Sequence, residues 1–400
     1  MFLLKNCRLV PQLTDGFAGT MADIIFDDEK IIEICTPGSV EHFDGKVFDA
    51  EGGTVLPGLF DLHCHVYMFD LSKIAEMDQK EEAYTFVDAY NFSREYLRQG
   101  YTTLRDAGCA HNITVKPRRL REAGLIEPIP DILSSGHALT PTNPCNDEFS
   151  QLYEVADGPY EVRKAVRKQF EAGNDVIKYM ATGCFLDETG IPGITIATED
   201  ELRAAVEITD LRGSHVMCHA HGADGIKKAI RAGARTIEHG SFIDEEAIEM
   251  LKERDDCYLV ATGAIGLVCM TEEGQAGLTD NVAAKAVLYE KKEREAVNKA
   301  YAAGLKIGFG SDIDYENFRN RPGLEFVARR EWYDFEPLDI LLQATRYSAE
   351  ILGLSESKGS IKVGKNAELV VVQGNPDEDP YVMTNLPKYV FFRGNVIENE

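Results

Sequence analysis

Short apolar runs alternate through the middle of the chain with longer segments in which apolar residues recur at helical spacing. The runs predict strands, and periodic charged segments such as 199–212 and 281–303 predict helices. Glycines close five of these helices just before the next strand, as short helix-to-strand loops require: Gly100, Gly124, Gly173, Gly233 and Gly304. The candidate strands are 54–65, 102–107, 131–137, 176–182, 216–221, 236–240, 258–262 and 306–312.

This alternation predicts an α/β fold. Eight strands with helices between them over roughly 300 residues fit a (β/α)8 TIM barrel. A doubly wound open sheet stays the alternative, because strand count alone does not exclude it.

Both chain ends differ from this middle. They consist of short β-rich runs separated by turn residues, such as 22–26, 367–372 and 389–397. We therefore predict a small β-sandwich domain assembled from residues 1–57 and 355–400, flanking a barrel of residues 58–354.

Composition narrows the function classes. The chain has 400 residues, 44% of them hydrophobic, and a formal net charge of -25, so it is expected to fold and to avoid nucleic acid and anionic membrane surfaces. No apolar run is long enough to span a bilayer, and the N-terminus reads as a first strand rather than a signal peptide. Nine cysteines without a CxxC pair favour reduced thiols, so we expect a cytoplasmic protein.

The strongest local motif is His63-Cys64-His65, which closes the first barrel strand. Residues two apart in a strand point to the same face, so both imidazoles converge, and neutral imidazole is a good zinc ligand. This motif alone is weak, because two histidines can end a strand by chance.

Other predicted strands carry similar chemistry where they end. Lys178 lies within an apolar run, where an unpaired ammonium would be costly to bury. His219, His221, His239 and Asp312 close three further strands. Barrel active sites form at the carboxyl ends of the strands, and neither core histidines nor a helix cap explains the whole set.

This set and its order resemble the amidohydrolase superfamily, and the resemblance covers essentially the whole chain. Three motifs resemble the branch of Xaa-Pro dipeptidases, zinc carboxypeptidases and imidazolonepropionase-like proteins. They are Thr102-Thr103-Leu104-Arg105-Asp106, His219-Ala220-His221-Gly222-Ala223-Asp224-Gly225 and Ile237-Glu238-His239-Gly240.

The resemblance implies two divalent metal ions, expected to be zinc, with Lys178 carboxylated by CO2 as the bridge between them. His63, His65 and Asp312 would hold one ion, and His219 and His239 the other. His219 and His221 share a strand face, so the choice between them stays open on geometry; the resemblance favours His219 and leaves His221 as a substrate contact.

The implied mechanism is attack by a metal-bridging hydroxide, with Asp312 shuttling the proton to the leaving nitrogen. His137 would bind the carbonyl oxygen or a substrate carboxylate, although a loop histidine is the alternative. Tyr179 would reach a substrate carboxylate or pack as a core aromatic. Arg105 and Asp106 are expected to form structural ion pairs.

We therefore expect a metal-dependent hydrolase cleaving an amide bond of a dipeptide (Xaa-Pro or carboxypeptidase-like) or an N-acyl amino acid. A cyclic amide or amidine hydrolase or deaminase is one alternative, and a non-catalytic barrel assembly protein is another. Lys178 favours the binuclear form, and the resemblance suggests a homo-oligomer. The loops 140–147, 184–195 and 263–277 are expected to shape the pocket.

Overall fold

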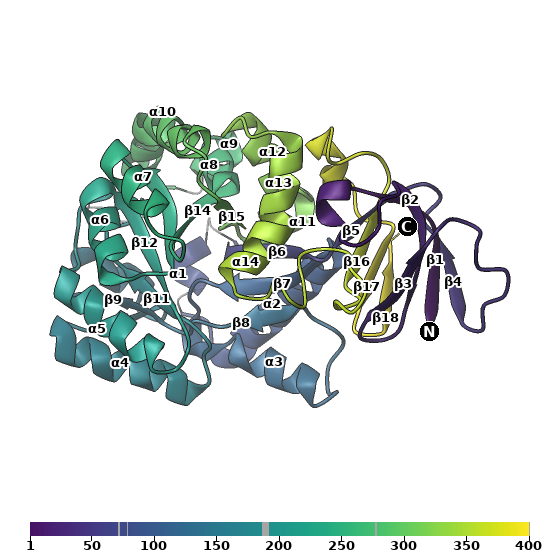
Figure 1. Cartoon of the computed structure of the whole chain (residues 1–400). Helices are drawn as coiled ribbons and strands as arrows, with labels where there is room; N and C mark the ends of the chain where they lie inside the picture. The colour runs from purple at the N-terminus through teal and green to yellow at the C-terminus, as the bar shows by residue number, and fades with distance from the viewer. Residues whose placement is uncertain (71–72, 78, 186–191, 277, 400) are drawn as a thin grey trace.

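The structure, a computed structural model, describes residues 1–70, 73–77, 79–185, 192–276 and 278–399. Strands from both chain ends form a sheet at one side of an α/β body, and the two termini lie in this same part of the molecule (Figure 1). The strands of this terminal sheet are β1 (Phe2–Leu9), β2 (Met21–Phe26), β3 (Ile31–Cys35), β4 (Lys46–Asp49), β5 (Thr54–Pro57), β16 (Leu369–Val372), β17 (Tyr389–Phe392) and β18 (Asn395–Glu398).

Hydrogen bonding joins these eight strands into one sheet, in which β1 pairs with β2, β4 and β5. The N-terminal and C-terminal halves meet where β5 pairs antiparallel with β16. Phe26, Phe48 and Phe391 pack edge to face in its core. Strands from both chain ends therefore share one hydrogen-bonded sheet, as the sequence predicted for the termini, whereas the β-sandwich arrangement stays a prediction.

The α/β body contains eight main parallel strands, and residues on or just after each of them except β8 line one cavity. These strands are β6 (Leu59–Cys64), β7 (Tyr101–Asp106), β8 (Asp131–Leu133), β11 (Ile177–Met180), β12 (Val216–Gly222), β13 (Thr236–Phe242), β14 (Tyr258–Thr262) and β15 (Ile307–Gly310). Two short strands, β9 (Ala138–Thr140) and β10 (Tyr153–Val155), extend the β11–β15 ladder.

Strand order distinguishes the two sequence-based folds. The ladders run β6-β7-β8 and β11-β12-β13-β14-β15, each in chain order. The backbone N–H of Asp312 donates to the carbonyl oxygen of His63 at 2.9 Å, so the ends of β15 and β6 also meet. A doubly wound sheet reverses its strand order midway, whereas this sequential order is that of a TIM-barrel-like fold.

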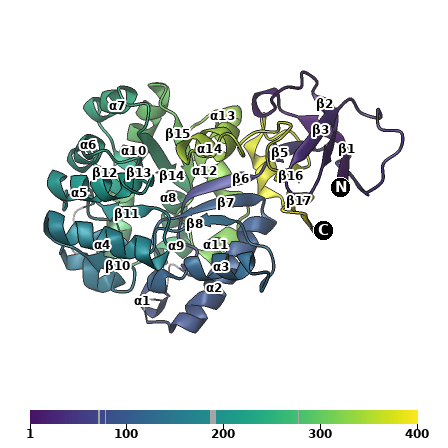
Figure 2. The same cartoon turned by 60° about the horizontal axis from the view of Figure 1, so that its bottom comes forward.

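Helices surround the parallel strands (Figure 2). The longer ones are α2 (Glu82–Arg98), α3 (Val115–Glu122), α4 (Gly158–Ala172), α5 (Glu199–Asp210), α6 (Ala223–Ala232), α7 (Glu245–Lys252), α8 (Gly263–Cys269), α10 (Asp280–Ala302) and α12 (Leu324–Glu331). The shorter ones are α1 (Ile74–Met77), α9 (Glu272–Ala276), α11 (Tyr315–Asn320), α13 (Pro337–Leu342) and α14 (Ser348–Ile351). All five glycines predicted to close helices have positive φ, from 69° at Gly124 to 100° at Gly233. In the part of the chain that the structure describes, no helix is long and apolar enough to cross a membrane.

The third barrel strand is shorter than the sequence predicted. Strand β8 ends at Leu133 rather than at His137. The carbonyl oxygen of Ser134 still accepts from the backbone N–H of Asp175 at 2.7 Å, and Gly136 then adopts φ 68°. The chain turns here, so His137 does not follow the direction of the strand.

Candidate metal centre

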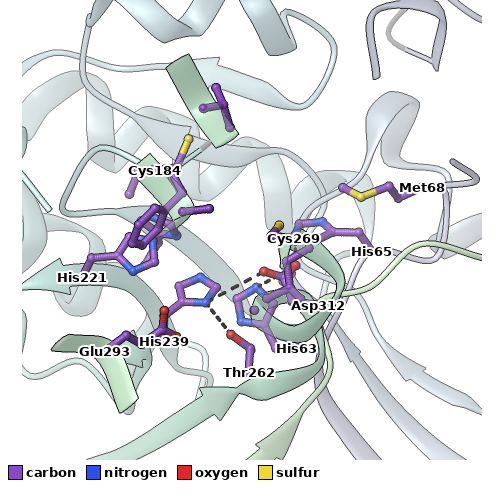
Figure 3. Close-up of a pocket in the computed structure, with 18 of the residues that line it drawn as sticks. His63, His65, Met68, Cys184, His221, His239, Thr262, Cys269, Glu293 and Asp312 are labelled. Atoms are coloured by element: carbon purple, nitrogen blue, oxygen red, sulfur yellow. Dashed lines mark hydrogen bonds and ion pairs between the residues drawn. The ribbon is translucent and has the colours of Figure 1, made fainter. Parts of the chain in front are cut away.

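Six of the side chains that the sequence singled out converge at the carboxyl ends of the strands. They line one cavity of about 150 Å³, on whose wall Figure 3 labels most of them. These residues are His63, His65, Lys178, His219, His239 and Asp312, and His221 lines the same cavity.

One group centres on Asp312, which follows β15. Its Oδ1 lies 3.5 Å from Nε2 of His65 and 3.7 Å from Nε2 of His63, and its Oδ2 lies 3.9 Å from Nδ1 of His239. Candidate ligand atoms of His63, His239 and Asp312 all lie within 4.8 Å of one another. Lys178 Nζ is 3.2 Å from Nε2 of His63, so the lysine lies directly beside this group.

A second group consists of His219, His221 and His239, whose candidate ligand atoms also lie within 4.8 Å of one another. The ring centroids are 4.5 Å apart for His219 and His221 and 4.7 Å for His219 and His239. Nε2 of His219 is buried and has no hydrogen-bond partner among the described residues. Leaving a buried ring nitrogen without a hydrogen-bond partner costs free energy, so a bound ligand at this nitrogen would be stabilising.

Backbone conformation brings these groups together. Glu238 and His239 are consecutive in β13, yet both reach the strand-enclosed interior, because His239 adopts φ 68°. Asp312 likewise has φ 55°. Such left-handed conformations cost about 1–3 kcal/mol in a non-glycine residue and concentrate at functional sites.

Each of four imidazoles is held through its Nδ1 atom. His63 Nδ1 lies 2.7 Å from Glu238, and His65 Nδ1 lies 2.7 Å from the carbonyl oxygen of Gly108. In the same way Thr262 lies 2.9 Å from His239 and Ser241 lies 2.8 Å from His221. A carbonyl oxygen only accepts, so His65 carries its proton on Nδ1 and presents the Nε2 lone pair, as a metal ligand must.

Burial favours the neutral form of these side chains. It lowers the pKa of His65 to about 3, an effect that nearby Lys178 increases. Burial also lowers the pKa of His63, His219 and His239 well below the usual range. Burial lowers the pKa of Lys178 as well, against the attraction of Glu238 and Asp312. Neutral nitrogen atoms with free lone pairs are the form in which these groups bind metals.

Glu238 is a buried residue of the site that the sequence did not reveal as functional. Its Oε1 lies 2.9 Å from Nη2 of Arg105, so the carboxylate joins Arg105 to His63. The structural ion pair predicted for Arg105 is thus present, with Glu238 as its partner. Asp106 instead accepts a hydrogen bond from Thr114. Alternation along the strand could have indicated Glu238, because Thr236 and Glu238 share a face.

Two predicted residues lie away from the cavity. Tyr179 is fully buried in the hydrophobic core, on the strand face opposite to Lys178. His137 lines a separate surface depression with Glu154 and Lys168, and its backbone N–H donates to Gln169 at 3.2 Å. The roles assigned to Tyr179 and His137 stay predictions that this geometry does not favour.

The outer cavity wall is mostly apolar. It comes from the segment after β9, from the end of β11, from α8 and α10, and from the end of α12. It includes Phe149, Leu152, Met180, Ile265, Met270, Val282 and Trp332. Part of the 263–277 segment thus lines the cavity, as the sequence predicted. In the 184–195 loop, Cys184 and Phe185 line it, whereas residues 186–191 lie outside the described residues. Of the 140–147 loop, no described residue is on the wall.

The donor set fits divalent metal ions. Neutral imidazoles and a carboxylate suit zinc and similar ions, and the second group offers the unpaired Nε2 of His219.

Comparison with known proteins agrees with this chemistry. The model of the Amidohydrolase family matches residues 54–397. Ochratoxinase of Aspergillus niger is 29% identical over 361 residues, which cover 81% of this chain and 71% of that protein. A solved Xaa-Pro dipeptidase with bound methionine in its active site superposes with a TM-score of 0.88 and 29% identity over 100% of both chains. A prolidase complexed with N-methylphosphonate-L-proline superposes with a TM-score of 0.86, also at 29% identity and 100% coverage of both.

Proposed function

The chain belongs to the amidohydrolase family and is a hydrolase acting on carbon–nitrogen bonds, and from this premise we propose that it cleaves an amide bond with two divalent ions. The observation that carries this proposal is the convergence of neutral imidazoles, Lys178 and Asp312 in one cavity. The sequential order of the parallel strands supports a closed eight-stranded barrel around it.

We assign His63, His65 and Asp312 to one ion and His219 and His239 to the other, with Lys178 between them. The 3.5 and 3.7 Å distances from Asp312 to the two histidines support the first assignment. The unpaired Nε2 of His219 supports the second. Bound at these residues, divalent ions would supply an activated water molecule near neutral pH and would polarise the scissile carbonyl group.

Lys178 is proposed to react with CO2. Its neutral amine forms an N–C bond as one C–O π bond of CO2 opens, the nitrogen releases one proton to solvent, and the product is a carbamate whose two oxygens share one negative charge. A lowered lysine pKa supports this step, because only the unprotonated amine attacks CO2. The carbamate would place an anion beside two cations, so its buried charge would be compensated.

Asp312 is proposed to move the proton. It is 19% exposed at the cavity, whereas Glu238 is fully buried behind His63. Asp312 would accept a proton from the attacking water and return it to the leaving nitrogen. Burial raises the pKa of Asp312 to about 7, although Lys178 opposes this, and a pKa near neutrality suits a group that both accepts and donates.

The cavity wall supports a substrate with a large apolar group. Apart from the proposed metal ligands, the charged residues on the cavity wall are Glu290 and Glu293. Among the described residues that line the cavity, Lys178 is the one lysine or arginine. Trp332 lies on the wall, and its buried Nε1 has no partner in the described part of the chain, so this N–H is free to donate to a substrate oxygen. We therefore propose a dipeptide or N-acyl amino acid with a bulky apolar side chain or acyl group.

The test is a panel of amides assayed with zinc- or manganese-loaded protein in bicarbonate. Dipeptides and N-acyl amino acids with apolar groups are compared with polar analogues, and with cyclic amidines as ammonia-releasing substrates. Release of a free amino acid, with a higher kcat/KM for the apolar members, is the expected result. Ammonia release from a ring would instead indicate a deaminase, and no turnover on any member would contradict the proposal.

A further inference from the structure

A line of hydrogen bonds leads from His221 at the cavity to the helical layer. Nδ1 of His221 lies 2.8 Å from Oγ of Ser241, which in turn bonds the carboxylate of Glu293. The hydroxyl of Tyr333 donates to Oε1 of Glu293 at 3.2 Å. None of these partners of His221 belongs to the two groups assigned to metal ions.

The fold brings these residues together from distant parts of the chain. His221 and Ser241 lie on the neighbouring parallel strands β12 and β13, and Glu293 lies on α10, which packs against β13. Ser241 and Tyr333 are fully buried, and Glu293 is partly buried on the cavity wall. Water therefore has little access to the hydroxyl of Ser241, which must find its partners within the protein.

Proton counting gives this line a direction. A serine hydroxyl has one proton to donate, and an ionised carboxylate only accepts. When Ser241 donates to Glu293, its oxygen is left to accept a hydrogen bond from His221. The imidazole proton must then sit on Nδ1, which leaves the lone pair on Nε2.

Glu293 carries a negative charge under mildly alkaline conditions. Burial raises its pKa to about 7, while hydrogen bonds from Tyr333 and Ser241 act in the opposite direction. At pH 8 the carboxylate form predominates.

We propose that Glu293 is a positioning residue that acts through Ser241 to hold His221 in one ring orientation with its proton on Nδ1. His221 then offers an Nε2 acceptor to the substrate. The role in turnover rests on the proposed amide hydrolysis, whereas the tautomer does not depend on it.

The tautomer is measured directly by NMR on metal-free protein labelled with 15N in histidine, at pH 8. The signals of His221 are assigned by their loss in His221→Gln. Glu293→Met removes the acceptor, Ser241→Ala breaks the line while keeping Glu293, and Glu293→Gln retains an acceptor oxygen. Glu295→Gln is the matched control, because Glu295 lies on the same helix but is 63% exposed.

We expect the Nδ1–H tautomer in the wild type, in Glu295→Gln and largely in Glu293→Gln. Glu293→Met and Ser241→Ala should both shift His221 to a mixture with Nε2–H. If His221 stays in the Nδ1–H form in these two variants, or is not in that form in the wild type, the proposal is wrong.

A kinetic comparison follows once a substrate is found. Glu293→Met and Ser241→Ala should lower kcat on the order of 10-fold at unchanged metal content, with less effect on KM and partial rescue in Glu293→Gln. An equal loss in Glu293→Gln and Glu293→Met would point to a packing role alone. Because the NMR result needs neither metal nor substrate, it distinguishes failure of this inference from failure of the proposed function.

Discussion

The Nδ1 atom of His63 lies 2.7 Å from Oε2 of Glu238, whose other oxygen lies 2.9 Å from Nη2 of Arg105, and all three side chains are buried. The carboxylate therefore orients a proposed metal ligand and compensates a buried guanidinium at once. A hydrogen bond of this kind fixes the histidine tautomer and increases the basicity of the ligand.

Replacing Glu238 should affect both metal binding and stability. In Glu238→Gln, His63 loses the carboxylate that orients its ring, so we expect zinc affinity to fall roughly 10- to 100-fold. Arg105 also loses its negatively charged partner. The unfolding free energy should fall by about 3–5 kcal/mol, the usual effect of leaving a buried charge unpaired. Zinc titration and thermal unfolding measure the two effects, with the exposed Glu245→Gln as control. Zinc affinity equal to that of the wild type would contradict the role assigned to Glu238.

Lys178→Ala should abolish turnover while leaving the fold intact. The side chain lies at the cavity and not in the hydrophobic core, so its removal costs little packing. We expect kcat/KM to fall by at least about 1,000-fold, or about 4 kcal/mol. Circular dichroism checks the fold, and Lys168→Ala, a lysine that is 56% exposed and paired with Glu154, is the control. Retained activity without Lys178 would exclude the bridging carbamate.

Asp312→Asn tests proton transfer by Asp312 with little change in the shape of its side chain. Asparagine keeps the side-chain size and tolerates the φ of 55°. At saturating zinc, kcat should fall by about 100- to 10,000-fold, the usual contribution of a general acid–base group. Asp334→Asn is the matched control, since Asp334 also has a positive φ (52°) but is 83% exposed. An unchanged kcat in Asp312→Asn would assign the proton transfer to another residue.

Asp131 gives stability a pH dependence at acid pH. Burial opposes its ionisation, but Lys358, Arg121 and Arg393 outweigh burial and lower the pKa of Asp131 to about 2. Because the pKa is depressed on folding, the stabilisation is complete above the unfolded value of 3.8 and is lost as the pH falls through 2. Denaturant unfolding of the wild type and Asp131→Asn should differ at pH 6 and converge towards pH 2. A difference that stays constant over this range would contradict the ion pairs.

The sequence indicated those site residues that share one position, at or near the end of a parallel strand. His63, Lys178 and Asp312 each end or approach the end of a strand, and the parallel arrangement brings such positions together. Tyr179 is next to Lys178 in the strand, so its side chain points to the opposite face, away from the cavity. Most strands were predictable because apolar runs mark them and helix-closing glycines precede them.

The residues that the sequence did not reveal depend on local backbone turns or on distant contacts. His137 does not line the cavity, because Gly136 turns the chain after a three-residue strand. No apolar pattern in the sequence marks that turn. Glu293 sits in a charged helix that resembles a solvent-facing one. Only the packing of α10 against β13 brings its carboxylate to Ser241.

The most direct test of the central claim is the number of divalent metal ions per chain in protein purified without chelator and supplied with zinc and bicarbonate. Inductively coupled plasma mass spectrometry on the wild type and on Lys178→Ala measures this number. The account predicts close to two ions per chain in the wild type and fewer in Lys178→Ala. Fewer than one ion per wild-type chain, or an equal number in both proteins, would contradict it.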